Sequence, residues 1–289
     1  MNGFLLVDKQ ANCTSFDVVA KVRNLTKVKT GHLGTLDPKA SGVLVLALGK
    51  ATRLIEYLSD GYKSYIFDIS WGKSTDSHDA DGNVTYENDS VPDISDLEDI
   101  KNCFKGDIWQ YPPKYSALKI NGKRAYNLAR DNIEFELNSR RMHVYDISIL
   151  LHEKKITRFE IKVSKGFYVR SLARDIVDKL GLAGHVTYLR RIDVAYFSCD
   201  KFLDSDEIFK SKNSNIVANN IINMNLLYFT SHNLYLSECY RRDITNGCNI
   251  RINNLPFSED SIISLRLGKE LAAICCYKSN KLIIKKMFI

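Results

Sequence analysis

Asp37 is the residue of this chain whose surroundings best suit it to chemistry. It lies in the segment Gly-His-Leu-Gly-Thr-Leu-Asp-Pro-Lys-Ala-Ser-Gly at residues 31–42. The glycines of this segment permit backbone angles closed to other residues, and Pro38 favours an extended conformation at Asp37. An aspartate presented by such a turn could act as a nucleophile or a general base. It could equally belong to an Asp-Pro turn whose carboxylate only accepts backbone hydrogen bonds, and the spacing alone leaves both interpretations open.

Predicted strands and a helix on either side of this turn must hold it in position. Residues 43–48 form a continuous run of β-branched residues and leucine, which is typical of a strand buried on both faces. Residues 3–7 predict a second buried strand. Thr14 or Ser15 could cap a helix whose valines recur at helical spacing.

The remaining pattern predicts an α+β fold with two units. Apolar residues alternate with polar ones around Tyr65, as in a half-buried strand. We further expect a short helix at 52–58, a polar loop at 73–83, a surface helix at 89–107, strands at 142–151, 156–163 and 185–197, and a helix at 168–180 that ends at Gly181. Residues 211–225 predict part of a connection, after which the short strands of 228–289 could form a small barrel.

The charge of the chain is unevenly distributed. The formal net charge is +7, which suits a polyanionic partner without requiring one. Residues 110–141 carry seven Lys and Arg against three acidic residues, whereas residues 76–107 carry ten acidic residues against two Lys. If a nucleic acid binds, we expect it to lie along residues 110–141, with most of residues 76–107 turned away.

Cysteine usage and hydropathy argue against several classes of protein. The seven cysteines are irregularly spaced and include no Cys-x-x-Cys pair, so we expect neither a disulfide framework nor a metal site. The first ten residues lack the pattern of a signal peptide, and the longest apolar stretch is too short to span a bilayer. These features predict a cytoplasmic protein without a membrane segment, and we expect it to be a monomer.

Seven motifs in a fixed order resemble the TruB family of bacterial tRNA pseudouridine synthases. The resemblance covers about residues 3–200 and includes the central motif around Asp37, Lys63-Ser-Tyr65, and the run that begins at Gln110. The other motifs are residues 5–9 with 14–15, residues 75–82, residues 164–170 and residues 185–191, and the run that begins at Gln110 leads on to Gly122 and residues 125–130. The family usually has proline where this chain has Gln10.

The resemblance implies the fold and the domain boundaries. It implies a pseudouridine-synthase catalytic domain at 1–227 with a mixed central β-sheet flanked by helices. An RNA-gripping subdomain would be inserted at about 110–141, and a short PUA-like RNA-binding domain would follow at 228–289. The implied reaction isomerises the uridine at position 55 in the T-loop of tRNA. It requires no cofactor and no metal, and its partner is the T-stem-loop.

The same resemblance implies the roles of individual residues. Asp37 matches the catalytic aspartate, Arg170 the arginine that pairs with it, and Tyr65 the tyrosine that stacks on the target uracil. Leu189 matches the apolar wall of the substrate pocket. His32 matches the histidine that enters the space left by the flipped base.

Contacts with the rest of the RNA are predicted for a further set of residues. We expect phosphate contacts from Lys9, Lys119, Arg130 and Arg141, and a contact between Asp79 and a neighbouring base. Two alternatives remain open. One is a non-catalytic RNA-binding protein or folding chaperone, and the other is a guide-RNA-dependent pseudouridine synthase.

Overall fold

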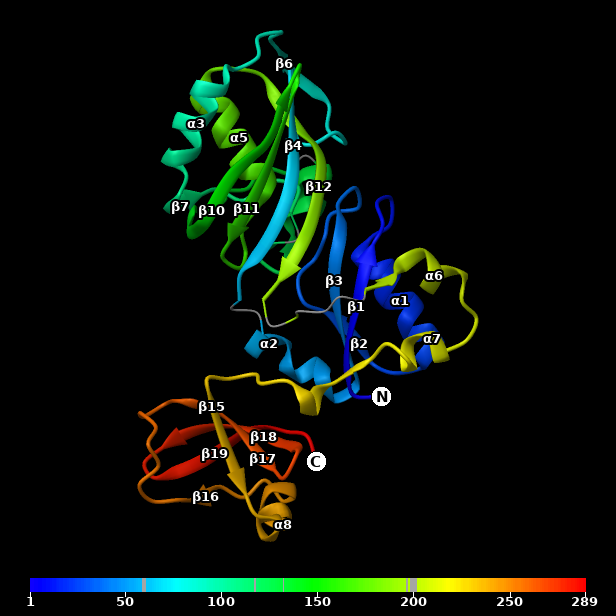
Figure 1. Ribbon diagram of the computed structural model, residues 1–289, viewed down its shortest axis with the longest axis vertical. Helices are drawn as coiled ribbons and strands as arrows, with labels where there is room; N and C mark the ends of the chain where they lie inside the picture. The colour runs from blue at the N-terminus through cyan, green and yellow to red at the C-terminus, as the bar shows by residue number, and fades with distance from the viewer. Residues whose placement is uncertain (59–60, 117, 132, 196, 198–201) are drawn as a thin grey trace.

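Ten strands form one mixed β-sheet in the computed structural model, which describes residues 1–58, 61–116, 118–131, 133–195, 197 and 202–289 (Figure 1). The strand order is β13-β1-β3-β12-β4-β11-β10-β7, with β14 beside β1 and β2 beside β3. The strands are β1 (Gly3–Lys9), β2 (Thr30–His32), β3 (Ser41–Leu48), β4 (Lys63–Trp71), β7 (Gly106–Gln110), β10 (Arg140–Glu153), β11 (Ile156–Val163), β12 (Gly184–Val194), β13 (Leu203–Asp204) and β14 (Ile222–Asn223). The expected mixed central sheet is confirmed.

The two halves of this sheet meet at a short parallel pairing between β3 and β12. Ser41 and Gly42 pair there with Arg190 and Arg191. Gly42 has a φ of +102°, and a Cβ at this position would lie 2.1 Å from the Arg191 carbonyl oxygen. Only glycine fits so close an approach at a positive φ. The junction therefore brings the turn that precedes β3 against β12.

Helices cover the sheet in two groups. Helices α1 (Ser15–Thr26), α6 (Ser205–Lys210) and α7 (Asn215–Ala218) lie near β1, whereas α3 (Ile94–Cys103) and α5 (Val169–Leu180) cover the part that contains β10 and β11 (Figure 1). Thr14 caps α1, and its side chain and that of Asp17 form a capping box. Gly181 ends α5 in the left-handed conformation, as its position predicted.

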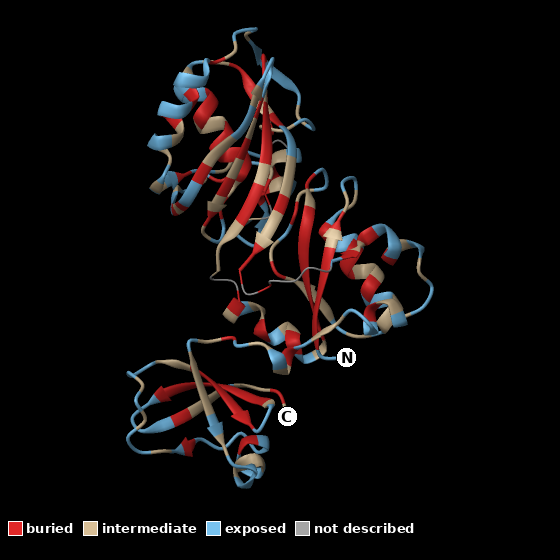
Figure 2. Ribbon diagram, in the orientation of Figure 1, coloured by how far each residue is buried: buried red, intermediate tan, exposed pale blue. Residues whose placement is uncertain are grey.

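Buried residues are concentrated along the central strands and the helices beside them (Figure 2), and apolar side chains form a cluster on each face of the sheet. The helix-covered face includes Val7, Leu46, Phe67, Phe159, Leu172 and Ile176. On the other face, Phe4 and Val45 join a cluster with residues of the 3-10 helix η1 (Gly49–Leu54) and helix α2 (Ile55–Leu58). This cluster continues into Leu271 and Phe288. The C-terminal part therefore shares a core with the main sheet.

The C-terminal part is a five-stranded sheet in the order β15-β17-β18-β19-β16. Its elements are β15 (His232–Leu236), η3 (Glu238–Tyr240), α8 (Arg241–Thr245), β16 (Ile250–Arg251), β17 (Ile262–Leu267), β18 (Glu270–Lys278) and β19 (Lys281–Met287), and η2 (Met224–Leu226) leads into it. Lys50 Nζ donates to the Phe288 carbonyl at 2.6 Å, which ties this sheet to η1. The expected small C-terminal β-unit is present.

Local structure differs from the expectation at residues 73–83 and 89–107. The predicted loop at 73–83 contains β5 (Lys73–Thr75), which pairs with β6 (Val84–Glu87). The predicted helix at 89–107 is shorter, because α3 ends at Cys103 and β7 follows. Within the basic segment the structure has β8 (Lys119–Ile120), β9 (Lys123–Arg124) and α4 (Ala125–Arg130). Tyr196, in the strand predicted at 185–197, and Cys199 lie outside the described residues.

Candidate active site

Asp37 lies in the turn between β2 and β3, and hydrogen bonds hold the backbone on both sides of it. Ser15 Oγ accepts from the Leu36 N–H at 2.9 Å and donates to the Leu36 carbonyl at 3.0 Å. Lys9 Nζ donates to the Pro38 carbonyl at 3.2 Å. The start of α1 and the end of β1 therefore fix the two residues next to Asp37. The Asp37 side chain remains 42% exposed, so its carboxylate is presented rather than enclosed.

Arg170, in the first turn of α5, is the partner of this carboxylate. Its side chain is 6% exposed, and Nη2 lies 2.9 Å from Asp37 Oδ2. Nη1 lies 3.1 Å from Asp79 Oδ2. The guanidinium also donates to the carbonyls of Ser77 and Tyr115, at 3.1 and 2.9 Å. One buried cation thus connects two carboxylates and two loops.

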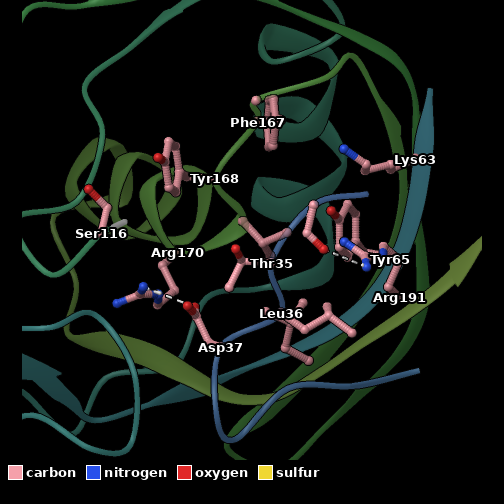
Figure 3. Close-up of a pocket in the computed structure, with 14 residues that line it drawn as sticks. Thr35, Leu36, Asp37, Lys63, Tyr65, Ser116, Phe167, Tyr168, Arg170 and Arg191 are labelled. Carbon is pink, nitrogen blue, oxygen red and sulfur yellow. Dashed lines mark hydrogen bonds and ion pairs between the residues drawn. The ribbon is translucent and has the colours of Figure 1, made fainter. Parts of the chain in front are cut away.

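A cavity of about 210 Å³ lies in front of this ion pair (Figure 3). Four of the predicted site residues line it, namely Asp37, Tyr65, Leu189 and Arg170. Tyr65 comes from β4 and is 8% exposed, and Leu189 comes from the neighbouring strand β12. An ionised carboxylate, an aromatic ring and an apolar wall therefore face one space, which suits a planar, uncharged ring bound beside a catalytic acid.

Two cationic residues of the cavity were not among the predicted site residues. Arg191 is 1% exposed and donates to the carbonyls of Val43 and Gly34 at 2.7 and 3.1 Å. It thereby holds the Asp37 turn against β12. Lys63 begins β4, and burial together with the Arg191 charge lowers the pKa of Lys63 to about 8. The motifs around residues 63–65 and 185–191 contain both residues and were the signal that could have identified them.

His32 is half-buried on β2 and does not line the cavity. Burial, assisted by the nearby Arg191 charge, lowers the pKa of His32, so its ring is neutral near pH 7. Its Nδ1 is buried and has no hydrogen-bond partner among the residues that the structure describes. The structure therefore separates His32 from the four residues that it brings together, and its stacking role stays a prediction.

The residues predicted to contact RNA have different surroundings. Lys119, Arg130 and Arg141 are exposed, so their phosphate contacts stay predictions. The prediction for Lys9 is wrong, because its side chain is 0% exposed and its ammonium donates to three backbone carbonyls of the turns at residues 10–13 and 38. Burial accordingly lowers the pKa of Lys9. The burial of Lys9 could not be predicted from the sequence, because a lysine beside a polar turn is usually solvated.

Asp79 has contacts that its sequence neighbours did not predict. Besides the ion pair with Arg170, its Oδ1 accepts from Ser77 Oγ at 2.5 Å and from the Asp81 N–H at 3.0 Å. The carboxylate therefore orients the guanidinium that pairs with Asp37. Its predicted contact with a base stays a prediction.

The described part of the chain contains no group of three or more His, Cys, Asp and Glu side chains arranged to hold a metal ion. None of its helices, over the same described ranges, is long and apolar enough to cross a membrane.

Comparison with known proteins identifies the family. Residues 22–169 match the TruB family pseudouridylate synthase (N terminal domain). The chain is 41% identical over 209 residues to tRNA pseudouridine synthase B of Ureaplasma urealyticum serovar 10, covering 71% of this chain and 91% of that protein. It is 35% identical over 251 residues to the protein of the same name from Clostridium acetobutylicum, covering 86% of each.

Solved structures show the same fold over nearly the whole chain. A chain of a Cbf5-Nop10-Gar1 complex matches with a TM-score of 0.73 and 24% identity, over 99% of this chain and 85% of the other. A chain of the archaeal box H/ACA sRNP Nop10-Cbf5 complex matches with a TM-score of 0.72 and 22% identity, over 100% and 86%. The family match and the relatives agree with this fold. The chain belongs to the TruB family of pseudouridylate synthases.

Proposed function

We propose that this chain isomerises the uridine at position 55 in the T-loop of tRNA to pseudouridine, without a guide RNA. The observation that carries the proposal is the 2.9 Å ion pair of Asp37 and Arg170 beside a cavity walled by Tyr65 and Leu189. The relatives named tRNA pseudouridine synthase B support tRNA as the substrate. The motifs of the TruB family support position 55 and an unguided reaction.

The isomerisation breaks the bond between C1′ and N1, rotates the base and joins C1′ to C5. Attack on the base, attack on C1′ and removal of a C2′ proton all require an ionised carboxylate, which Asp37 supplies beside Arg170. The ring of Tyr65 stacks on the uracil, and its hydroxyl assists proton transfer at C5. Leu189 supplies an apolar surface that keeps water from the ring.

The target uridine lies within a folded loop and must be flipped out, at a cost of about a few kcal/mol. Neutral His32 stacks in the space that the base leaves. The exposed side chains of Lys119, Arg130 and Arg141 contact phosphates, and Asp79 contributes by holding Arg170.

In this proposal, each of the two sheets belongs to a domain with its own role. Residues 1–227 form the catalytic domain, and the basic segment 110–141 grips the RNA beside the cavity that Ser116 helps to line. Residues 228–289 form a short PUA-like RNA-binding domain around the five-stranded sheet.

Tritium release from C5-labelled uridine in an isolated T-stem-loop tests the proposal. Wild-type protein should release tritium from this stem-loop without any added guide RNA. The Asp37→Asn variant should release none while binding the stem-loop with nearly unchanged affinity. Its fold should persist, because the Asp37 carboxylate is 42% exposed and Arg170 keeps its ion pair with Asp79 and its two backbone acceptors.

Two other outcomes would assign a different function. If wild-type protein binds the stem-loop but releases no tritium, the chain is an RNA-binding or folding protein. If release requires an added guide RNA, the chain is a guide-dependent synthase. Both outcomes would contradict the proposal.

A further inference from the structure

Lys63 places a cationic side chain inside the candidate active site. It is the first residue of β4, and two-residue periodicity puts its side chain on the same face as Tyr65. Figure 3 shows its ammonium directed into the cavity, on the opposite side from Asp37 and Arg170. A ring stacked on Tyr65 would therefore lie between the catalytic carboxylate and this ammonium.

The ammonium of Lys63 has no hydrogen-bond or ion-pair partner within residues 1–58, 61–116, 118–131, 133–195, 197 and 202–289. The Gly34 carbonyl beside it is bound by Arg191, and Asp37, across the cavity, pairs with Arg170. Nζ lies against the backbone of Gly34, where an added Cβ would be 3.2 Å away. A lysine ammonium has three donors, so this one is available to a ligand.

The position is unfavourable for a cation in the free protein. The side chain is half-buried, and the Arg191 guanidinium repels it. Both effects lower the pKa of Lys63, to about 8, which still leaves the ammonium predominantly protonated at pH 7. A perturbed cation that lines a cavity and has no ion-pair partner of its own among the described residues is typical of a functional group rather than a structural one.

We infer that Lys63 is a catalytic residue, whose ammonium donates to a carbonyl oxygen of the flipped uracil and stabilises the negative charge that the ring acquires. This inference rests on the proposed function. When the C1′–N1 bond breaks, its electron pair stays with the ring and is shared among N1, O2 and O4. The C1′–C5 bond then forms, C5 loses its proton and N1 gains one. Lys63 keeps its own proton throughout and acts only through its charge and hydrogen bond.

Single-turnover tritium release with Lys63→Met and Lys63→Arg tests this role. Removing one preorganised donor to developing negative charge lowers the rate by about 10²-fold, so Lys63→Met should show a loss of this size. Lys63→Arg retains a cation and should recover at least a tenth of the wild-type rate. Affinity for the stem-loop, measured by fluorescence anisotropy, should change by less than about threefold. Lys162→Met is the matched control, since this lysine lies on the adjacent strand β11 and does not line the cavity.

The pH profile separates a charge effect from a structural one. The charged and titratable side chains that line the cavity with Lys63 are Asp37, Tyr65, Tyr168, Arg170 and Arg191. The wild-type rate should fall as the pH rises through about 8, where Lys63 loses its proton. Lys63→Arg should move this fall to higher pH, because an arginine stays protonated.

The experiments distinguish failure of the proposed function from failure of the inference about Lys63. If wild-type protein releases no tritium, the proposed function itself fails. If wild-type protein is active and Lys63→Met releases tritium within about threefold of its rate, the inference about Lys63 is refuted. A weakened affinity with an unchanged single-turnover rate would also refute it, because Lys63 would then contact a phosphate of the RNA.

Discussion

Replacing Arg170 with methionine should destabilise the fold and inactivate the enzyme together. Methionine keeps an unbranched apolar side chain but removes the charge and every N–H donor. The carboxylates of Asp37 and Asp79 and the carbonyls of Ser77 and Tyr115 would all lose a partner. The variant therefore tests whether one buried guanidinium organises the whole site.

The loss of stability comes mainly from the partners of Arg170 that remain buried and cannot bind water in its place. The Asp79 side chain is 19% exposed, whereas Asp37 is 42% exposed and its ion pair is screened by solvent. Removing one partner of a buried ion pair costs about 3–5 kcal/mol. Because Asp37 can rehydrate, we expect a value near the lower limit, about 3 kcal/mol. For a domain of this size, such a loss lowers the Tm by about 6–12 °C.

Thermal unfolding followed by circular dichroism measures the stability, and single-turnover tritium release measures the activity. We expect release to fall by about 10²–10³-fold, because Arg170 no longer orients the Asp37 carboxylate. Adding Asp79→Asn to Arg170→Met removes the orphaned charge and should recover about 1–2 kcal/mol. The control is Lys105→Met, because the ion pair of Lys105 with Asp146 is exposed and should be worth about 1 kcal/mol or less.

Two results would refute this reasoning. One is an Arg170→Met protein whose Tm lies within about 2 °C of wild type, which would mean that the buried contacts contribute little. The other is a double variant no more stable than the single one. In that case an unpaired Asp79 would not be the source of the instability.

Three further substitutions test the supports of the site. Gly42→Ala should lower the free energy of unfolding by about 3 kcal/mol in urea titrations, because its Cβ would lie 2.1 Å from the Arg191 carbonyl oxygen; equal stability would contradict the tight junction. Lys9→Met should lower it by about 2–4 kcal/mol, because three carbonyls lose a buried donor, and an unchanged Tm would contradict that role. Burial and the Arg174 charge lower the pKa of His78 from 6.5 to about 4, so the folded state binds fewer protons and stability should fall as the pH drops from about 6.5 to about 4. His78→Asn tolerates the φ of 60° at this position and should flatten that dependence in urea titrations at pH 7 and pH 5; an unchanged slope would exclude His78 as its source.

Much of the fold was predictable because its signals are local. Apolar periodicity identified the strands around residues 43–48 and Tyr65, and the candidate caps Thr14 and Ser15 marked the start of α1, where the structure has Thr14 as the cap. The hairpin of β5 and β6 was missed because its strands have only three and four residues, which is too short for a periodic pattern to stand out. The boundary between α3 and β7 was missed because only two residues separate the helix from the strand, so their apolar periodicities run together.

The sequence by itself determined that Asp37 sits in a constrained turn and that Tyr65, Arg170 and Leu189 belong to motifs in a family order. Only the tertiary structure decided which side chains meet. The short β3–β12 junction brings segments far apart in the chain to one cavity, and this proximity pairs Arg170 with both Asp37 and Asp79. The surroundings also give two lysines different roles. Lys9 donates to backbone carbonyls, whereas Lys63 faces the cavity without a partner in the described structure. Charge and exposure depend on what surrounds a side chain, and residues distant in sequence supply those surroundings.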